Sequence, residues 1–199
     1  MLALQGAFIE HVHALERLGV AAREVRLPRD LERLDGLIMP GGESTTIGKL
    51  MVQYHLDEPI RARARAGFPI WGTCAGMILL AKDIGGLHQP LIGVMDIVVE
   101  RNAFGRQLDS FEADLAIPAI GTEPFHTIFI RAPLIHAVSG NTEILATLDD
   151  GRIVAARQDT LLATSFHPEL TNDDRLHRYF IEEIVVTPSR VRNDTRTAA

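Results

Sequence analysis

The single cysteine of the chain, Cys74, lies where a strand is expected to turn sharply into a helix. An apolar strand leads into Gly72, and an apolar helix follows Gly76. Glycines on both sides of a nucleophile permit a tight strand-to-helix turn, which places the thiol at a helix amino terminus and leaves the amide of Ala75 free to stabilise an oxyanion. A buried structural cysteine in a tight turn is the alternative. The paired glycines and the strand–helix context favour a nucleophile.

A thiolate nucleophile needs a base and a group that orients the base. His167 and Glu169 follow an apolar run and are two residues apart, so on an extended segment they project to the same side. A carboxylate beside an imidazole fixes its tautomer and stabilises the imidazolium. Alone, this pattern is typical of a surface turn. In combination with Cys74 it predicts a catalytic triad.

Two glycines, Gly41 and Gly42, follow another apolar run, and Glu43 and Ser44 come next. Paired glycines can turn backbone amides toward a ligand, and the polar side chains after them can hold a small polar substrate. The segment lacks the Gly-Lys-Ser/Thr sequence of a phosphate-binding loop, and a plain turn is the other interpretation. Ligands of parallel sheets bind at the carboxyl ends of the strands, where all three motifs are expected to meet.

The composition restricts the class of protein. The chain has 199 residues, 46% of them hydrophobic and 23% charged, with a net charge of −6, which is typical of a soluble globular domain. The acidic balance argues against nucleic-acid binding, and no segment has the roughly 20 apolar residues of a membrane span. There is no CxxC or HExxH metal motif, and His11 and His13 would face apart on a helix. No signal peptide is recognisable, so we expect a cytoplasmic location.

Hydrophobic patterning predicts one α/β domain over residues 1–186. Strands at 2–4, 20–27, 36–39 and 69–71 alternate with helices in the first half, which indicates a largely parallel sheet flanked by helices. After about residue 88 the pattern changes to short strands with antiparallel connections, at 91–99, 111–117, 125–130, 144–148, 153–157 and 161–166. Ser44 and the following threonines are expected to cap a helix. A last helix is expected over 173–186, and the polar residues 187–199 are predicted to form a disordered tail.

The segments 3–6, 40–46, 72–76, 99–107, 129–133 and 166–170 together resemble the class I, triad-type glutamine amidotransferases, and more narrowly the glutaminase subunit of pyridoxal 5′-phosphate synthase. The resemblance extends from residue 2 to about residue 184. It implies the fold of that family, and it implies L-glutamine as the substrate.

Carried over residue by residue, the resemblance implies specific roles. Cys74 would be the nucleophile, His167 the general base and then acid, and Glu169 the orienting carboxylate. The implied substrate-binding residues are Gly42, Glu43, Ser44, Arg101, Ile130 and Arg131, and the implied oxyanion hole comprises Gly41, Gly42 and Ala75. A guanidinium such as that of Arg101 suits the substrate α-carboxylate; without the resemblance, Arg101 and Arg131 read as ordinary surface ion pairs.

The resemblance also implies a partner. Family members deliver ammonia to a separate synthase subunit, whose docking orders the Gly41–Gly42 turn, and they bind no cofactor of their own. Family members usually carry an acidic residue at the position of Ala7. Because this region of the family docks against the synthase, the change to alanine is expected to affect the affinity for the partner. The chain also begins within the first strand, where family members have a few more residues. The alternatives are an amidotransferase of another pathway, such as imidazole or purine synthesis, or a non-catalytic redox sensor with a reactive cysteine.

Overall fold

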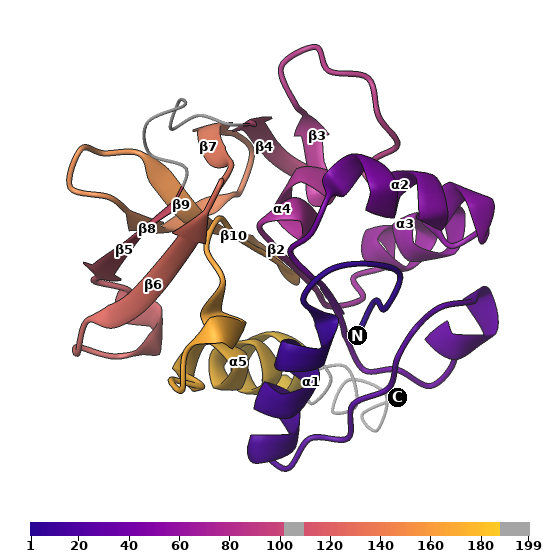
Figure 1. Cartoon of the computed structure of the whole chain (residues 1–199), viewed down its shortest axis with the longest axis horizontal. Coiled ribbons are helices and arrows are strands. Elements are labelled where there is room, and N and C mark those ends of the chain that lie inside the picture. Colours follow the sequence, from indigo (N-terminus) through magenta and orange to yellow (C-terminus); the bar gives the residue numbers. More distant parts are fainter. Residues whose placement is uncertain (102–109, 188–199) are drawn as a thin grey trace, which may run out of the picture.

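A curled sheet of eight strands runs through the computed structural model, which describes residues 1–101 and 110–187 (Figure 1). Its strand order is β1-β2-β10-β9-β7-β4-β3, with β8 paired to β9, and β5 and β6 form a separate two-stranded sheet. The strands are β1 (Leu37–Met39), β2 (Ile70–Thr73), β3 (Ala81–Asp83), β4 (Met95–Glu100), β5 (Ser110–Leu115), β6 (Phe125–Ile130), β7 (Leu134–Val138), β8 (Glu143–Thr147), β9 (Ile153–Gln158) and β10 (Leu161–Thr164).

The parallel part of the sheet carries the segments predicted to do chemistry. β2 pairs in parallel with both β1 and β10, and all three strands are buried throughout. Alternate residues of β1 face opposite layers, since Leu37 and Met39 join one apolar cluster and Ile38 joins the other. Burial on both faces explains why these strands read as continuous apolar runs.

Helices cover both faces of the sheet (Figure 1). Side chains of α2, α3 and α4 pack into one cluster, while those of α1, α5 and the π-helix η4 pack into the other. The helical segments are α1 (Phe8–Arg17), η1 (Pro28–Leu31), α2 (Ser44–Gln53), α3 (Asp57–Arg65), α4 (Ala75–Leu80), η2 (Pro118–Ile120), η3 (Pro168–Leu170), α5 (Arg175–Tyr179) and η4 (Phe180–Val186). The predicted α/β fold, with a parallel centre and antiparallel additions in the second half, is confirmed.

Three details differ from the sequence-based prediction. The first two predicted strands, 2–4 and 20–27, reduce to a single parallel bridge between Leu2 and Val25. The Ala3 amide donates to the Val25 carbonyl, and the Val25 amide donates to the Met1 carbonyl. The predicted helix 173–186 changes from an α-helix to a π-helix at Phe180. Strands β3 and β7 were not predicted. The predicted tail, beyond Thr187, lies outside the described residues, so the domain boundary at residue 186 stays a prediction.

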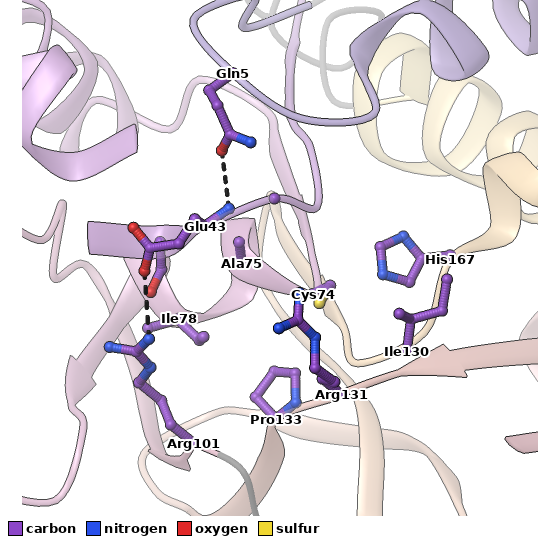
Figure 2. Close-up of a pocket in the computed structure, with 12 residues that line it drawn as sticks. Gln5, Glu43, Cys74, Ala75, Ile78, Arg101, Ile130, Arg131, Pro133 and His167 are labelled. Atoms are coloured by element: carbon purple, nitrogen blue, oxygen red, sulfur yellow. Dashed lines mark hydrogen bonds and ion pairs between the residues drawn. The ribbon is translucent and has the colours of Figure 1, made fainter. Parts of the chain in front are cut away.

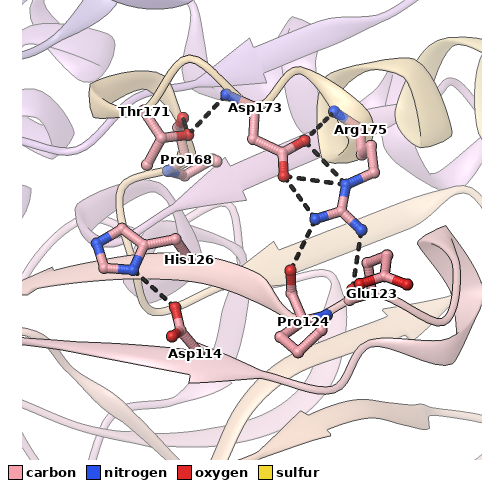
Figure 3. A network of polar contacts seen from close by, with 8 residues as sticks. All are labelled: Asp114, Glu123, Pro124, His126, Pro168, Thr171, Asp173 and Arg175. Carbon is pink, nitrogen blue, oxygen red and sulfur yellow. Dashed lines mark hydrogen bonds and ion pairs between the residues drawn. The ribbon is translucent and has the colours of Figure 1, made fainter.

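A polar network fixes the start of α5 against the small sheet (Figure 3). The Arg175 guanidinium donates to the carbonyls of Glu123 and Pro124, at 2.9 and 2.8 Å, and pairs with Asp173. The Asp173 carboxylate also accepts the backbone amide of Arg175, the first residue of α5. The network ties the β5–β6 hairpin to the helix that lies behind the predicted triad.

Candidate active site

The turn from β2 into α4 holds Cys74 in a strained conformation, with φ 47° and ψ −102°. Its amide donates to the Thr164 carbonyl on β10 at 2.8 Å. A Cβ on Gly72 would lie 2.4 Å from the backbone of Gly76, and a Cβ on Gly76 would lie 2.0 Å from the Met39 carbonyl oxygen. Both glycines are therefore required sterically, as the sequence pattern predicts for a nucleophile elbow.

His167 and Glu169 lie beside this turn, at the carboxyl end of β10. His167 Nδ1 is 2.7 Å from Glu169 Oε1, and both residues are buried. The pKa of His167 reflects opposing causes. Burial lowers it, but hydrogen bonds and charge interactions with Cys74 and Glu169 outweigh the burial and raise the pKa to about 10. The structure thus brings the three predicted triad residues together; their catalytic roles stay predictions.

A pocket of about 310 Å³ opens in front of Cys74 and His167 (Figure 2). That volume is at the lower end of the roughly 300–1,000 Å³ of small-molecule sites. The predicted substrate-binding residues all line it, as do Ala75, Cys74 and His167. The lining residues are Gln5, Gly42, Glu43, Ser44, Cys74, Ala75, Ile78, Arg101, Ile130, Arg131, Pro133 and His167. Gly41 and Glu169 lie behind this lining, against His167.

The Gly41–Gly42 turn is braced by the segment that precedes α1. The amide of Ala7 donates to the Gly41 carbonyl at 3.0 Å, and the Gln5 side-chain oxygen accepts the amide of Glu43 at 2.8 Å. Gln5 was not among the predicted site residues, although it belongs to a motif of the resemblance. The signal that could have found it is its position after an apolar strand, which places it at the same sheet edge as the two glycines.

Glu43 has two contacts with different consequences. Its carboxylate accepts from the amides of Thr45 and Thr46 and from the Thr46 hydroxyl, so Glu43 caps α2. The prediction that Ser44 caps this helix is wrong, because the longer carboxylate reaches both amides. These hydrogen bonds, led by that from the Thr46 hydroxyl, lower the pKa of Glu43 to about 2. Its Oε1 also lies 3.5 Å from Arg101 Nη2, so the pocket presents a carboxylate and a guanidinium side by side.

Gln89 is a site residue that the sequence pattern does not reveal. Its side-chain oxygen accepts from the hydroxyls of Ser44 and Thr45, at 3.2 and 3.1 Å, and from Arg101 Nη1 at 3.0 Å. One carboxamide therefore fixes three side chains at the rim of the pocket. The connection before β4 that carries Gln89 has no periodicity, which is why sequence patterns could not place it.

The opposite wall of the pocket comes from the end of β6. Ile130 is 38% exposed, and Arg131 follows with a positive φ of 44°. The part of the predicted motif at 102–107 lies outside the described residues. Within residues 1–101 and 110–187, no cluster of three or more His, Cys, Asp or Glu side chains could hold a metal ion. None of the helices described there has the length and apolar character needed to span a bilayer.

Comparison with known families agrees with this geometry. The model of the SNO glutamine amidotransferase family matches residues 1–186. The chain belongs to this family. Among relatives, the "Pyridoxal 5′-phosphate synthase subunit PdxT" of Herpetosiphon aurantiacus is 62% identical over 184 residues, covering 91% of this chain and 97% of the relative. The protein of the same name from Moorella thermoacetica is 59% identical over 184 residues, covering 92% and 97%.

Two solved structures share this fold, and one of them also agrees with the family assignment. A structure described as a glutamine amidotransferase aligns with a TM-score of 0.86 at 54% identity, covering 91% of this chain and 95% of its own. A structure of PurLQS from Thermotoga maritima aligns with a TM-score of 0.66 at 16% identity, covering 92% and 95%. The second likeness is one of fold alone.

Proposed function

We propose that the chain is the glutaminase subunit of a pyridoxal 5′-phosphate synthase, which hydrolyses L-glutamine to glutamate and ammonia. The observation that carries the proposal is the convergence of Cys74, His167 and Glu169 beside a pocket that presents both a guanidinium and a carboxylate. The family membership and the names of the relatives support the same activity.

The pocket suits the two charged groups of an amino acid. The guanidinium of Arg101 would pair with the substrate α-carboxylate, and the carboxylate of Glu43 would face its ammonium group. Ser44, Ile130 and Arg131 would complete the seat of the substrate. When the charged end of glutamine is held at this rim, its side-chain amide would reach the sulfur of Cys74.

The proposed chemistry proceeds through a thioester. The Cys74 thiolate attacks the amide carbon, and backbone amides of Ala75 and the Gly41–Gly42 turn hold the oxyanion. His167, oriented by Glu169, donates a proton to the nitrogen as the carbon–nitrogen bond breaks, and ammonia leaves. His167 then accepts a proton from water, which attacks the thioester and releases glutamate and the thiolate.

The ammonia would pass to a separate synthase subunit in the cytoplasm. The relatives are named as subunits of such a synthase, and the Gly41–Gly42 turn lies beside the segment around Ala7, which is at the surface. Docking over this segment would order the turn and raise the glutaminase rate. Neither the chain nor the proposed reaction requires a cofactor of its own.

The test is glutamate release by the purified chain mixed with its host's synthase subunit. We expect Cys74→Ala to abolish release, and Glu169→Gln to lower it by about 10²- to 10⁴-fold because the base loses its orienting charge. Glu143→Gln, at an exposed glutamate of β8, is the matched control and should keep the wild-type rate. Equal glutamate release by wild type and Cys74→Ala would contradict the enzyme assignment. Glutamate release at the same rate with and without the synthase would contradict the partner assignment.

A further inference from the structure

Two buried histidines lie in line behind the triad. His11 on α1 and His177 on α5 are both completely buried. His11 Nε2 is 3.3 Å from Glu169 Oε2, and His11 Nδ1 is 2.9 Å from His177 Nε2. The helices that carry them lie side by side under the parallel strands (Figure 1). A continuous row of polar contacts therefore runs from His177 through His11 and Glu169 to His167.

Glu169 needs a donor on the side away from His167. Its Oε1 is used by His167, whereas its Oε2 is buried and has no hydrogen bond within the described residues. Buried carboxylate oxygens are ordinarily matched by donors. His11 Nε2 lies at 3.3 Å from Oε2 and at 3.2 Å from the Thr73 hydroxyl oxygen, so a small rotation of its ring would turn the same N–H toward the carboxylate.

The pairing of nitrogens selects one tautomer for each ring. His177 Nδ1 is buried without a hydrogen bond, and a bare acceptor is tolerated there more readily than an N–H donor without a partner. The proton of His177 therefore belongs on Nε2, from which it is donated to His11 Nδ1. His11 in turn carries its proton on Nε2, facing Glu169 and Thr73. In the opposite tautomer, a lone pair of His11 would face a carboxylate.

Both rings are held neutral by their surroundings. Burial, followed by charge interactions with His177, with His167 and with the amino terminus, lowers the pKa of His11 well below its ordinary value. Burial also lowers the pKa of His177 to about 4. Glu169 is the negative group that faces His11, and the edge of Trp71 packs against both rings. The row therefore joins two neutral imidazoles to Glu169 and His167 through polar contacts.

We propose that His11 is a positioning residue of the triad: its Nε2–H, oriented by His177, holds the Glu169 carboxylate turned toward His167. The inference rests on the proposed roles of Cys74, His167 and Glu169. Without the donor, the Glu169 carboxylate is no longer held in place, the imidazolium of His167 loses its partner, and less Cys74 is present as thiolate at neutral pH.

The experiment compares His11→Leu, which removes the donor, with His11→Gln, which keeps an N–H at similar reach. The first readout is alkylation of Cys74 by iodoacetamide from about pH 5 to about pH 9, a range that spans the ordinary pKa values of histidine and cysteine. We expect His11→Leu to slow alkylation at neutral pH and shift its profile to higher pH. With the synthase present, kcat for glutamine should fall about 10- to 100-fold at unchanged KM. His11→Gln should retain most of the alkylation rate and most of kcat.

Equal losses of alkylation rate and kcat in His11→Leu and His11→Gln would mean that only packing was disturbed, and this would overturn the proposal. A pH profile of alkylation that is unaltered in both variants would also overturn it. The emission of Trp71, the one tryptophan of the chain, reports whether the packing around the rings survives. If His11→Leu does not fold, imidazole nitrogen NMR shifts of the wild type decide: a proton on Nδ1 of His11 overturns the proposal. Alkylation requires neither glutamine nor synthase, so its result stands even if the proposed activity fails.

Discussion

Two opposing influences act on the imidazole of His167. Burial disfavours its charged form, whereas the sulfur of Cys74 and the carboxylate of Glu169 favour it, and the balance raises the pKa to about 10. A histidine that holds its proton at neutral pH can keep the neighbouring sulfur as thiolate and later donate the proton to a leaving amine. The electrostatics of this one residue therefore serve both halves of the proposed reaction.

Replacing Cys74 by alanine should lower the pKa of His167 below its value of about 10, because the hydrogen bond and the negative charge of the sulfur are removed while burial remains. NMR titration of the histidine resonances measures the change. His126 is the internal control, because its pKa is raised by Asp114 and Glu112 at an exposed site on the small sheet, and it should titrate alike in both proteins. A His167 titration that does not move would show that the sulfur is not its partner.

At the scale of elements, the backbone of two turns shapes the site more than any side chain. The elbow after β2 presents Cys74, and the turn after β1 closes over His167. A Cβ added to Gly41 would lie 2.3 Å from His167 Cε1 and 2.9 Å from its Nδ1. These distances are too short for any L-residue other than glycine unless the imidazole moves. The position of the His167 ring thus depends on a glycine that does not line the pocket.

Gly41→Ala should therefore displace the His167 ring and lower glutaminase activity by about 10²-fold or more, because a misplacement of about 1 Å can cost that much. Glutamate release with the synthase present is the measurement. Gly85→Ala provides the control: Gly85 has φ +69° and no atoms within 4 Å of an added Cβ, so the substitution adds only backbone strain of about 1 kcal/mol at a residue that does not line the pocket. Full activity in Gly41→Ala would show that the imidazole has room to move without loss.

The sequence predicted the elements that carry chemistry better than those that support them. Cys74, His167 and Gly42 follow apolar strands whose burial on both faces gives a clear pattern. β7 was not predicted because Arg131 and Pro133 stand between it and β6, and the short run after them shows no clear alternation. The composition of the segment 20–27 predicts a strand, but only Val25 makes a bridge. Tertiary hydrogen bonding decided its conformation, and composition does not reveal such bonding.

At the scale of the whole molecule, the layer formed by α1 and α5 buries two histidines, His11 and His177, behind the predicted triad. These histidines therefore affect both the site and the stability of the protein. His11 was predicted only to make a poor metal ligand with His13, and His177 gave no signal. Both lie on the apolar faces of their helices among residues such as Leu15 and Leu176. A histidine among apolar residues reads as part of the core in the sequence, and only the packing of distant helices shows that the two rings meet.

The burial of His177 predicts how the stability of the protein depends on pH. Burial lowers the pKa of His177 to about 4 from its ordinary 6.5. As pH falls from 6.5 to 4, the unfolded chain binds a proton that the folded chain does not, so the free energy of unfolding falls by up to about 1.4 kcal/mol per pH unit for this group. His177→Gln removes the titration and should give a shallower decline in urea midpoints over this range, whereas His13→Gln, at an exposed histidine of α1, should follow the wild type. If His177→Gln declines as steeply as wild type, the ring is already protonated in the folded protein, and the neutral row of histidines behind Glu169 would not exist.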